Sequence, residues 1–106
     1  MIDGAILIGS GSEQAEARFS AVDPANGETL SPSISSAGTD AVEKAAALAE
    51  PAFPVYSTTD PESRAAFLEA CAEAILAIGD ELIVRAMSET GLPRARLEGE
   101  RGRTVG

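Results

Sequence analysis

The amino-acid sequence predicts a mostly α-helical chain that begins with short β-strands. Two observations support this fold class. Short apolar runs separated by Gly, Pro and Asn fill residues 5–35, and apolar residues then recur at helical spacing over residues 40–106. The length of 106 residues allows one domain at most, or part of one.

Residues 5–35 carry the signals of strands and tight turns. The run Ala5–Ile8 precedes Gly9-Ser10-Gly11-Ser12, and the run Phe19–Val22 precedes Asp23-Pro24-Ala25-Asn26-Gly27. Asn-Gly supplies the positive φ that a tight turn needs. Pro32 indicates an edge or a connector because proline cannot donate to a ladder. The segment therefore predicts an antiparallel hairpin or meander.

A first helix is predicted from Asp40. Thr39 or Asp40 is expected to cap it, and Pro51 and Pro54 are expected to end it. Its apolar face comprises Val42, Ala45, Ala46, Ala49 and Phe53.

Two further helices are predicted over residues 61–78 and 81–89. Pro61 suits a first helical position, and the Gly79-Asp80 dipeptide can end one helix and cap the next. Gly91 is expected to end the second. The apolar stripe of this region comprises Phe67, Leu68, Cys71, Ile75, Ile78 and Leu82.

A fourth helix can begin at Pro93. Leu97 and Val105 are its only large apolar residues, and its three glycines lower its helical propensity. Such a helix needs packing partners, and no residues after Gly106 are present to supply them.

The composition excludes several chemistries. Without His there is no Ser–His–Asp triad, no Cys–His pair and no imidazole ligand for a metal. A single Cys excludes an intrachain disulfide and a cysteine-cluster zinc site. Twenty of the hydrophobic residues are Ala, which bury little surface. We therefore expect marginal independent stability.

The charge and the N-terminus bear on location and partners. A net charge of −9 argues against nucleic-acid binding, and no apolar run is long enough to span a bilayer. The start Met1-Ile2-Asp3-Gly4 lacks the basic region of a signal peptide, and the single Cys fits a reducing compartment. The expectation is a cytoplasmic protein that does not bind membranes.

On the helix predicted over residues 61–78, the candidates for chemistry are Cys71 and the pair Glu69 and Glu73. Nothing basic is placed to activate the Cys71 thiol, so we interpret it as a small buried hydrophobic residue. Glu69 and Glu73 lie four residues apart and could share a proton, but a solvated helix face explains them better.

The other candidates concern phosphate binding. Gly9-Ser10-Gly11 resembles the start of a dinucleotide fingerprint, but Gln14 occupies the third glycine position, which favours a simple turn. Arg94, Arg96, Arg101 and Arg103 could bind phosphate, yet the interleaved Glu98 and Glu100 favour ion pairs on a helix surface. The residues alone therefore predict no catalytic, cofactor-binding or metal-binding residue.

Three segments together resemble the N-terminal region of the aldehyde dehydrogenase superfamily. Val22-Asp23-Pro24-Ala25-Asn26-Gly27-Glu28 is similar to that family's Asn-Pro-Ala-Thr-Gly-Glu turn. Asp40-Ala41-Val42-Glu43-Lys44-Ala45-Ala46, leading to Ala52-Phe53, is similar to its first helix. Arg64-Ala65-Ala66-Phe67-Leu68, Asp80-Glu81-Leu82 and Glu89-Thr90-Gly91-Leu92-Pro93 follow in the family's order and spacing.

The C-terminal stretch of the chain resembles one branch of that superfamily in particular. The run from Gly91 to Thr104, which has Leu92 where the family commonly has Lys, resembles the 2-oxoglutarate-semialdehyde (2,5-dioxopentanoate) dehydrogenase branch. The resemblance implies a parent enzyme of α/β fold that oxidises an aldehyde to an acid with NAD or NADP, through a Cys nucleophile and a Glu-activated water. Neither Glu69-Ala70-Cys71 nor Glu81-Leu82-Ile83-Val84 matches the family's motifs for those two groups.

The resemblance then implies that residues 1–106 are the N-terminal segment of the cofactor-binding domain, with the catalytic domain absent. The segment alone is expected to be inactive and to bind neither NAD nor NADP. Its partners are the remainder of the same enzyme and, in the parent, further copies in a homo-oligomer. Two alternatives stay open: a stand-alone acidic helical interaction module, and a degenerate remnant.

Overall fold

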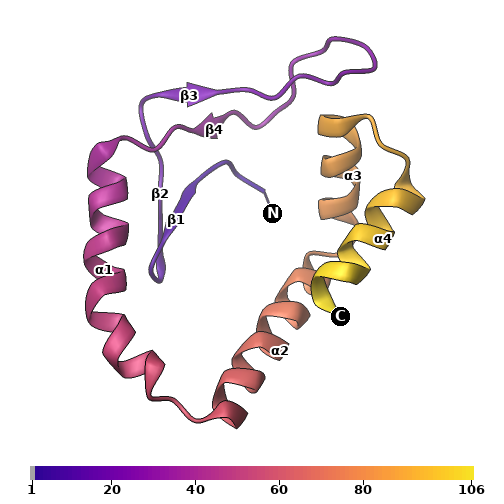
Figure 1. The fold of residues 1–106 in the computed structure, drawn as a ribbon. Helices are drawn as coiled ribbons and strands as arrows, with labels where there is room; N and C mark the ends of the chain where they lie inside the picture. Colours follow the sequence, from indigo (N-terminus) through magenta and orange to yellow (C-terminus); the bar gives the residue numbers. More distant parts are fainter. Residues whose placement is uncertain (1) are drawn as a thin grey trace. The chain divides into compact units, whose positions relative to one another are not determined.

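The computed structural model describes residues 2–106 as short antiparallel strands followed by helices (Figure 1). Strands β1 (Ile6–Ile8) and β2 (Gly11–Glu13) pair antiparallel, as do β3 (Arg18–Phe19) and β4 (Ile34–Ser35). The β1–β2 loop is Gly9-Ser10, with Gly9 at φ +61° in the first central position, as a type II′ turn requires. The predicted antiparallel hairpin is confirmed.

Four helices follow, and each begins close to its predicted residue. They are α1 (Thr39–Ser57), α2 (Pro61–Ile78), α3 (Asp80–Thr90) and α4 (Arg94–Val105). Gly91 ends α3 in the left-handed conformation, with its N–H donating to the carbonyl of Met87. The mostly helical fold class of this segment is therefore confirmed.

The predictions for α1 need two corrections. The helix continues through Pro51 and Pro54 to Ser57, although each proline removes a backbone donor. The alanine-rich run before them has high helical propensity, and the whole stretch is exposed, so water can take the freed carbonyls. The N-cap is Gly38, without a side-chain cap, rather than Thr39 or Asp40.

The caps of α3 and α4 also differ slightly from the prediction. Gly79 is the N-cap of α3 at φ +69°, and Asp80 is its first residue. Pro93 is the N-cap of α4 in extended backbone rather than its first residue. In both cases the boundary moves by one residue, which is the usual uncertainty at a helix end.

The chain divides into two compact units. One comprises Ile2–Ser20 and Pro32–Asp60, and in it α1 lies beside the β1–β2 hairpin (Figure 1). The other comprises Ala21–Ser31 and Pro61–Gly106, and in it α4 packs against both α2 and α3. We call the first the strand unit and the second the helical unit. The packing partners that α4 needs thus precede it in sequence.

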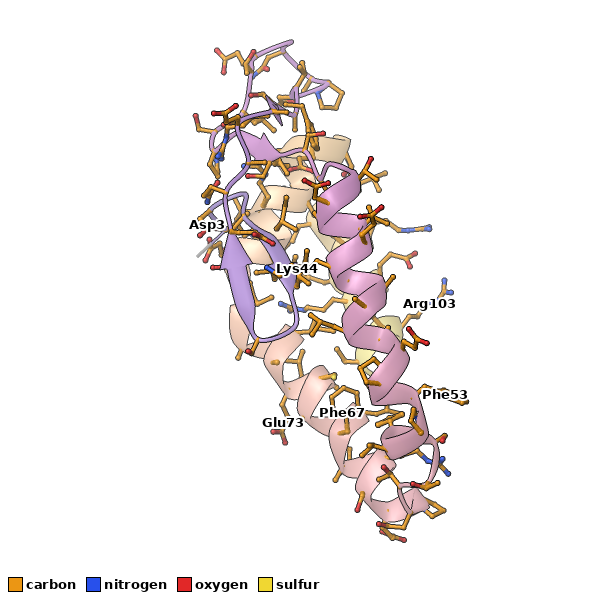
Figure 2. All side chains as sticks on the ribbon, turned by 90° about the vertical axis from the view of Figure 1, so that its left-hand side faces the viewer. Asp3, Lys44, Phe53, Phe67, Glu73 and Arg103 are labelled. Atoms are coloured by element: carbon orange, nitrogen blue, oxygen red, sulfur yellow. The ribbon has the colours of Figure 1, made fainter. Side chains whose placement is uncertain are left out.

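The hydrophobic core is very small. Among the residues described, Ile83 of α3 is the only buried hydrophobic side chain, at 2% exposure. Many large apolar side chains are exposed, and Figure 2 shows Phe53 projecting from α1 and Phe67 from α2. The prediction that Cys71 is buried is wrong, because the face of α2 that carries it is not covered.

Candidate functional site

The helical unit contains an apolar groove of about 370 Å³. Its floor combines the C-terminal part of α2, one side of α3 and Leu97 of α4. The lining residues are Ile75, Ile78, Leu82, Ile83, Ala86, Leu97, Glu100, Arg101 and Thr104. The lining is mostly aliphatic, and its polar side chains are engaged elsewhere. Arg101 donates to the Gly79 carbonyl, Glu100 pairs with Arg96, and Thr104 donates to the Glu100 carbonyl. The groove therefore fits an apolar surface best.

Arginine side chains of α4 hold the junction between α2 and α3. Arg101 donates to the carbonyl of Gly79 at 3.1 Å, and Arg94 forms a two-pronged ion pair with Asp80. Arg96 pairs with Glu100 at 2.8 Å along the helix. The prediction of ion pairs on this helix surface is confirmed, and three of the four arginines also pair with Glu98 or Glu100.

The Asp80–Arg94 pair perturbs both groups. The hydrogen bond from Arg94 holds the pKa of the Asp80 carboxyl below its ordinary value of 3.8, and the same bond raises the pKa of Arg94. Because the folded-state pKa of Asp80 is lowered, the pair stabilises the fold above the ordinary pKa. That stabilisation is lost as the pH falls through the lowered value.

We expect a titration of the Asp80 carboxyl by NMR to show a midpoint below 3.8 in the unsubstituted chain. Arg94→Gln should return the midpoint toward 3.8 because it removes the hydrogen bond. Arg96→Gln is the matched control, since Arg96 pairs with Glu100 instead. An unshifted midpoint in the unsubstituted chain would contradict the pair.

The strand unit contains a polar network and an open cleft. Arg18 donates to Gln14, to the Ser33 hydroxyl at 2.7 Å and to the Ser33 carbonyl at 2.7 Å. The buried Ser35 hydroxyl accepts from the N–H of Ala15 and donates to Gln14. Since these groups satisfy one another, the network fixes the loop before β3 against β4.

The cleft lies between the hairpin and the start of α1 and has a volume of about 470 Å³. Its charged residues are Glu13, Asp40 and Lys44. Lys44 extends from α1 toward the hairpin and pairs with Glu13 at 3.1 Å (Figure 2). The one cation is therefore neutralised, and the remaining carboxylate would repel an anionic ligand.

The other candidate residues are not brought together. Cys71 and Glu69 are exposed on α2, and Glu73 points away from that helix (Figure 2). Within residues 2–106 no group of three or more Cys, Asp or Glu side chains could hold a metal ion. None of the helices described there is long and apolar enough to cross a membrane.

The glycine pair does not fit a dinucleotide. Gly9 lies in the turn of a hairpin, and Gly11 begins β2 rather than a helix. A phosphate-binding loop needs backbone N–H groups aimed out of a strand–turn–helix unit. This turn joins two paired strands, so it does not have the geometry of a phosphate-binding loop.

Sequence reasoning did not single out Arg85, and it did not predict that Arg101 bonds to Gly79 or that Arg94 pairs with Asp80. The (i, i+4) spacing of Arg85 and Glu89 was the one available signal, since such pairs meet on a helix surface. Arg101 and Arg94 reach residues 22 and 14 positions away, which no local pattern indicates.

In the described residues, the only buried hydrophobic side chain is that of Ile83, and many large apolar side chains are exposed. Residues 11–106 match the model of the aldehyde dehydrogenase family, and the chain belongs to that family. The resemblance derived from the three sequence segments is thereby confirmed.

Two curated relatives are similar to the chain. Alpha-ketoglutaric semialdehyde dehydrogenase 2 of Azospirillum brasilense is 48% identical over 99% of this chain and 20% of its own length. Alpha-ketoglutaric semialdehyde dehydrogenase of Acinetobacter baylyi is 44% identical over 69% of this chain and 14% of its own length. These relatives confirm the similarity to the 2-oxoglutarate-semialdehyde branch. No solved structure matches the chain significantly. The chain spans a fifth or less of each relative.

Proposed function

We propose that this chain is the N-terminal segment of the cofactor-binding domain of an α/β-fold aldehyde dehydrogenase. The whole enzyme would oxidise 2-oxoglutarate semialdehyde to the acid with NAD or NADP. The observation that carries the proposal is the 48% identity to a semialdehyde dehydrogenase across 99% of this chain. Residues outside this segment would bind the cofactor and would include the reactive Cys and Glu.

The surfaces of the chain support a scaffolding role. Phe67 and Leu68 of α2, and Phe53 and Val55 of α1, are more than half exposed. Large apolar side chains gathered on helix faces favour burial against other polypeptide. We propose that the remainder of the enzyme covers them, and that the parent is a homo-oligomer.

The functional assignment can be tested by a graft. This chain would replace the matching stretch of the Azospirillum brasilense relative, and aldehyde-dependent reduction of NAD and of NADP would be measured. We expect the graft to oxidise 2-oxoglutarate semialdehyde, whereas the 106-residue chain alone should show no turnover. The control is the relative with the stretch deleted, which should be inactive.

Two results would contradict the proposal. A graft that folds but does not turn over would show that the chain cannot serve as this part of the enzyme, and would favour an interaction module. Turnover by the isolated chain would show that it contains a reactive centre of its own.

A further inference from the structure

The segment Ala21–Ser31 forms a short self-bonded arm within the helical unit. Val22 and Thr29 form an isolated antiparallel bridge, and Gly27 at φ +77° closes the tip. Its internal backbone bonds join Asp23 N–H to Glu28 carbonyl, Gly27 N–H to Asp23 carbonyl and Leu30 N–H to Ala21 carbonyl. In Figure 1 the arm is the stretch of chain that connects β3 to β4. Because these bonds stay within the arm, they do not attach it to the helices.

One side chain of α3 makes that attachment. Arg85 donates through Nη1 to the carbonyl of Ser31 at 2.5 Å, across 54 residues of sequence. Its Nε donates to Glu89 Oε1 at 2.5 Å, which orients the guanidinium along the helix. Pro24 of the arm also lies near the end of α3, since a Cβ added at Gly91 would come within 3.2 Å of Pro24 Cγ.

The third guanidinium nitrogen of Arg85, Nη2, has no partner among the residues described, and this bears on why an arginine occupies the position. The side chain is only 14% exposed, and Nη2 is buried with no hydrogen-bond partner among the residues described. An unpaired buried donor is costly, so an apolar side chain would fill this space better than a guanidinium does. The two bonds that Arg85 does form must therefore account for its position.

We propose that Arg85 is a positioning residue that latches the arm onto α3, with Glu89 acting through it. The unpaired Nη2 weakens the latch, because the docked state carries a cost that a fully paired arginine would not. The arm therefore opens as a local unit before the helices unfold. Neither the family assignment nor the proposed function is needed for this inference.

Hydrogen exchange of the full 106-residue chain, resolved by peptide mass spectrometry, tests the latch. Arg85→Gln should speed exchange of the arm amides about tenfold or more, because a charged hydrogen bond to the Ser31 carbonyl is lost. Peptides of α2 and α4 should keep their rates. Arg96→Gln is the matched control, since it also removes an (i, i+4) ion pair but touches no residue of the arm.

A third variant tests whether the charge of Glu89 is needed to orient Arg85. Glu89→Gln keeps an acceptor for Arg85 Nε, so we expect arm exchange between that of the unsubstituted chain and that of Arg85→Gln. Three results would overturn the proposal. They are an unprotected arm in the unsubstituted chain, equal arm rates in Arg85→Gln and Arg96→Gln, or a rise of exchange in α2 and α4 as large as in the arm.

Discussion

Replacing Ile83 with Ala is expected to unfold the helical unit. Ile83 is the one hydrophobic side chain that is buried in the described chain, at 2% exposure, and it forms part of the groove between α2, α3 and α4. Truncating a buried Ile to Ala costs about 2–5 kcal/mol. Because the unit buries so little other apolar surface, a decrease of this size in its free energy of unfolding is expected to unfold it.

Val84→Ala is the matched control, since Val84 is the next residue of α3 and is 47% exposed. It should change the free energy of unfolding by about 0.5 kcal/mol or less. Urea unfolding followed by far-ultraviolet circular dichroism measures both variants. Equal midpoints for Ile83→Ala and the unsubstituted chain would show that Ile83 is not the centre of the unit.

Replacing Gly4 with Ala is expected to disrupt the strand unit. Gly4 has φ +73°, and a Cβ there would lie 2.2 Å from the carbonyl oxygen of Ser33. The backbone must move, which breaks the hydrogen bond from Ser35 N–H to the Gly4 carbonyl at 2.8 Å. Left-handed backbone and the lost bond together cost about 3 kcal/mol.

Gly27→Ala is the control that separates the cost of positive φ from the clash with the Ser33 carbonyl. Gly27 also has positive φ, at +77°, but a Cβ there meets nothing within 4 Å. It should cost only the conformational penalty, about 1–2 kcal/mol. Hydrogen exchange of the β1–β2 and β4 peptides measures the effect of Gly4→Ala. Equal losses of stability in the two variants would show that the Ser33 carbonyl does not matter.

Local signals predicted most of the element boundaries. Pro61 begins α2, and Gly79 and Gly91 mark helix ends because both adopt a positive φ that other residues avoid. The same rules failed at Pro51 and Pro54, where exposure and alanine propensity allow the helix to continue. Local chemistry therefore predicts where a helix can end, but the surroundings decide whether it does.

Burial and long-range contacts could not be predicted in this way. The spacing of Phe67, Cys71 and Ile75 predicts one apolar face of α2, but not whether another element covers it. The Arg85–Ser31 bond joins residues 54 apart, and no pattern along the chain indicates it. Such contacts depend on how elements pack, and this information is not local.

The accessibility of Cys71 tests the central claim, that the uncovered faces of this segment are built for burial by the rest of an aldehyde dehydrogenase. A thiol reagent would be applied to the isolated chain and to the graft, and modification read on the peptide that contains Cys71. We expect rapid modification in the isolated chain, where the thiol is exposed, and strong protection in the graft. Equal rates in the two proteins would contradict the claim.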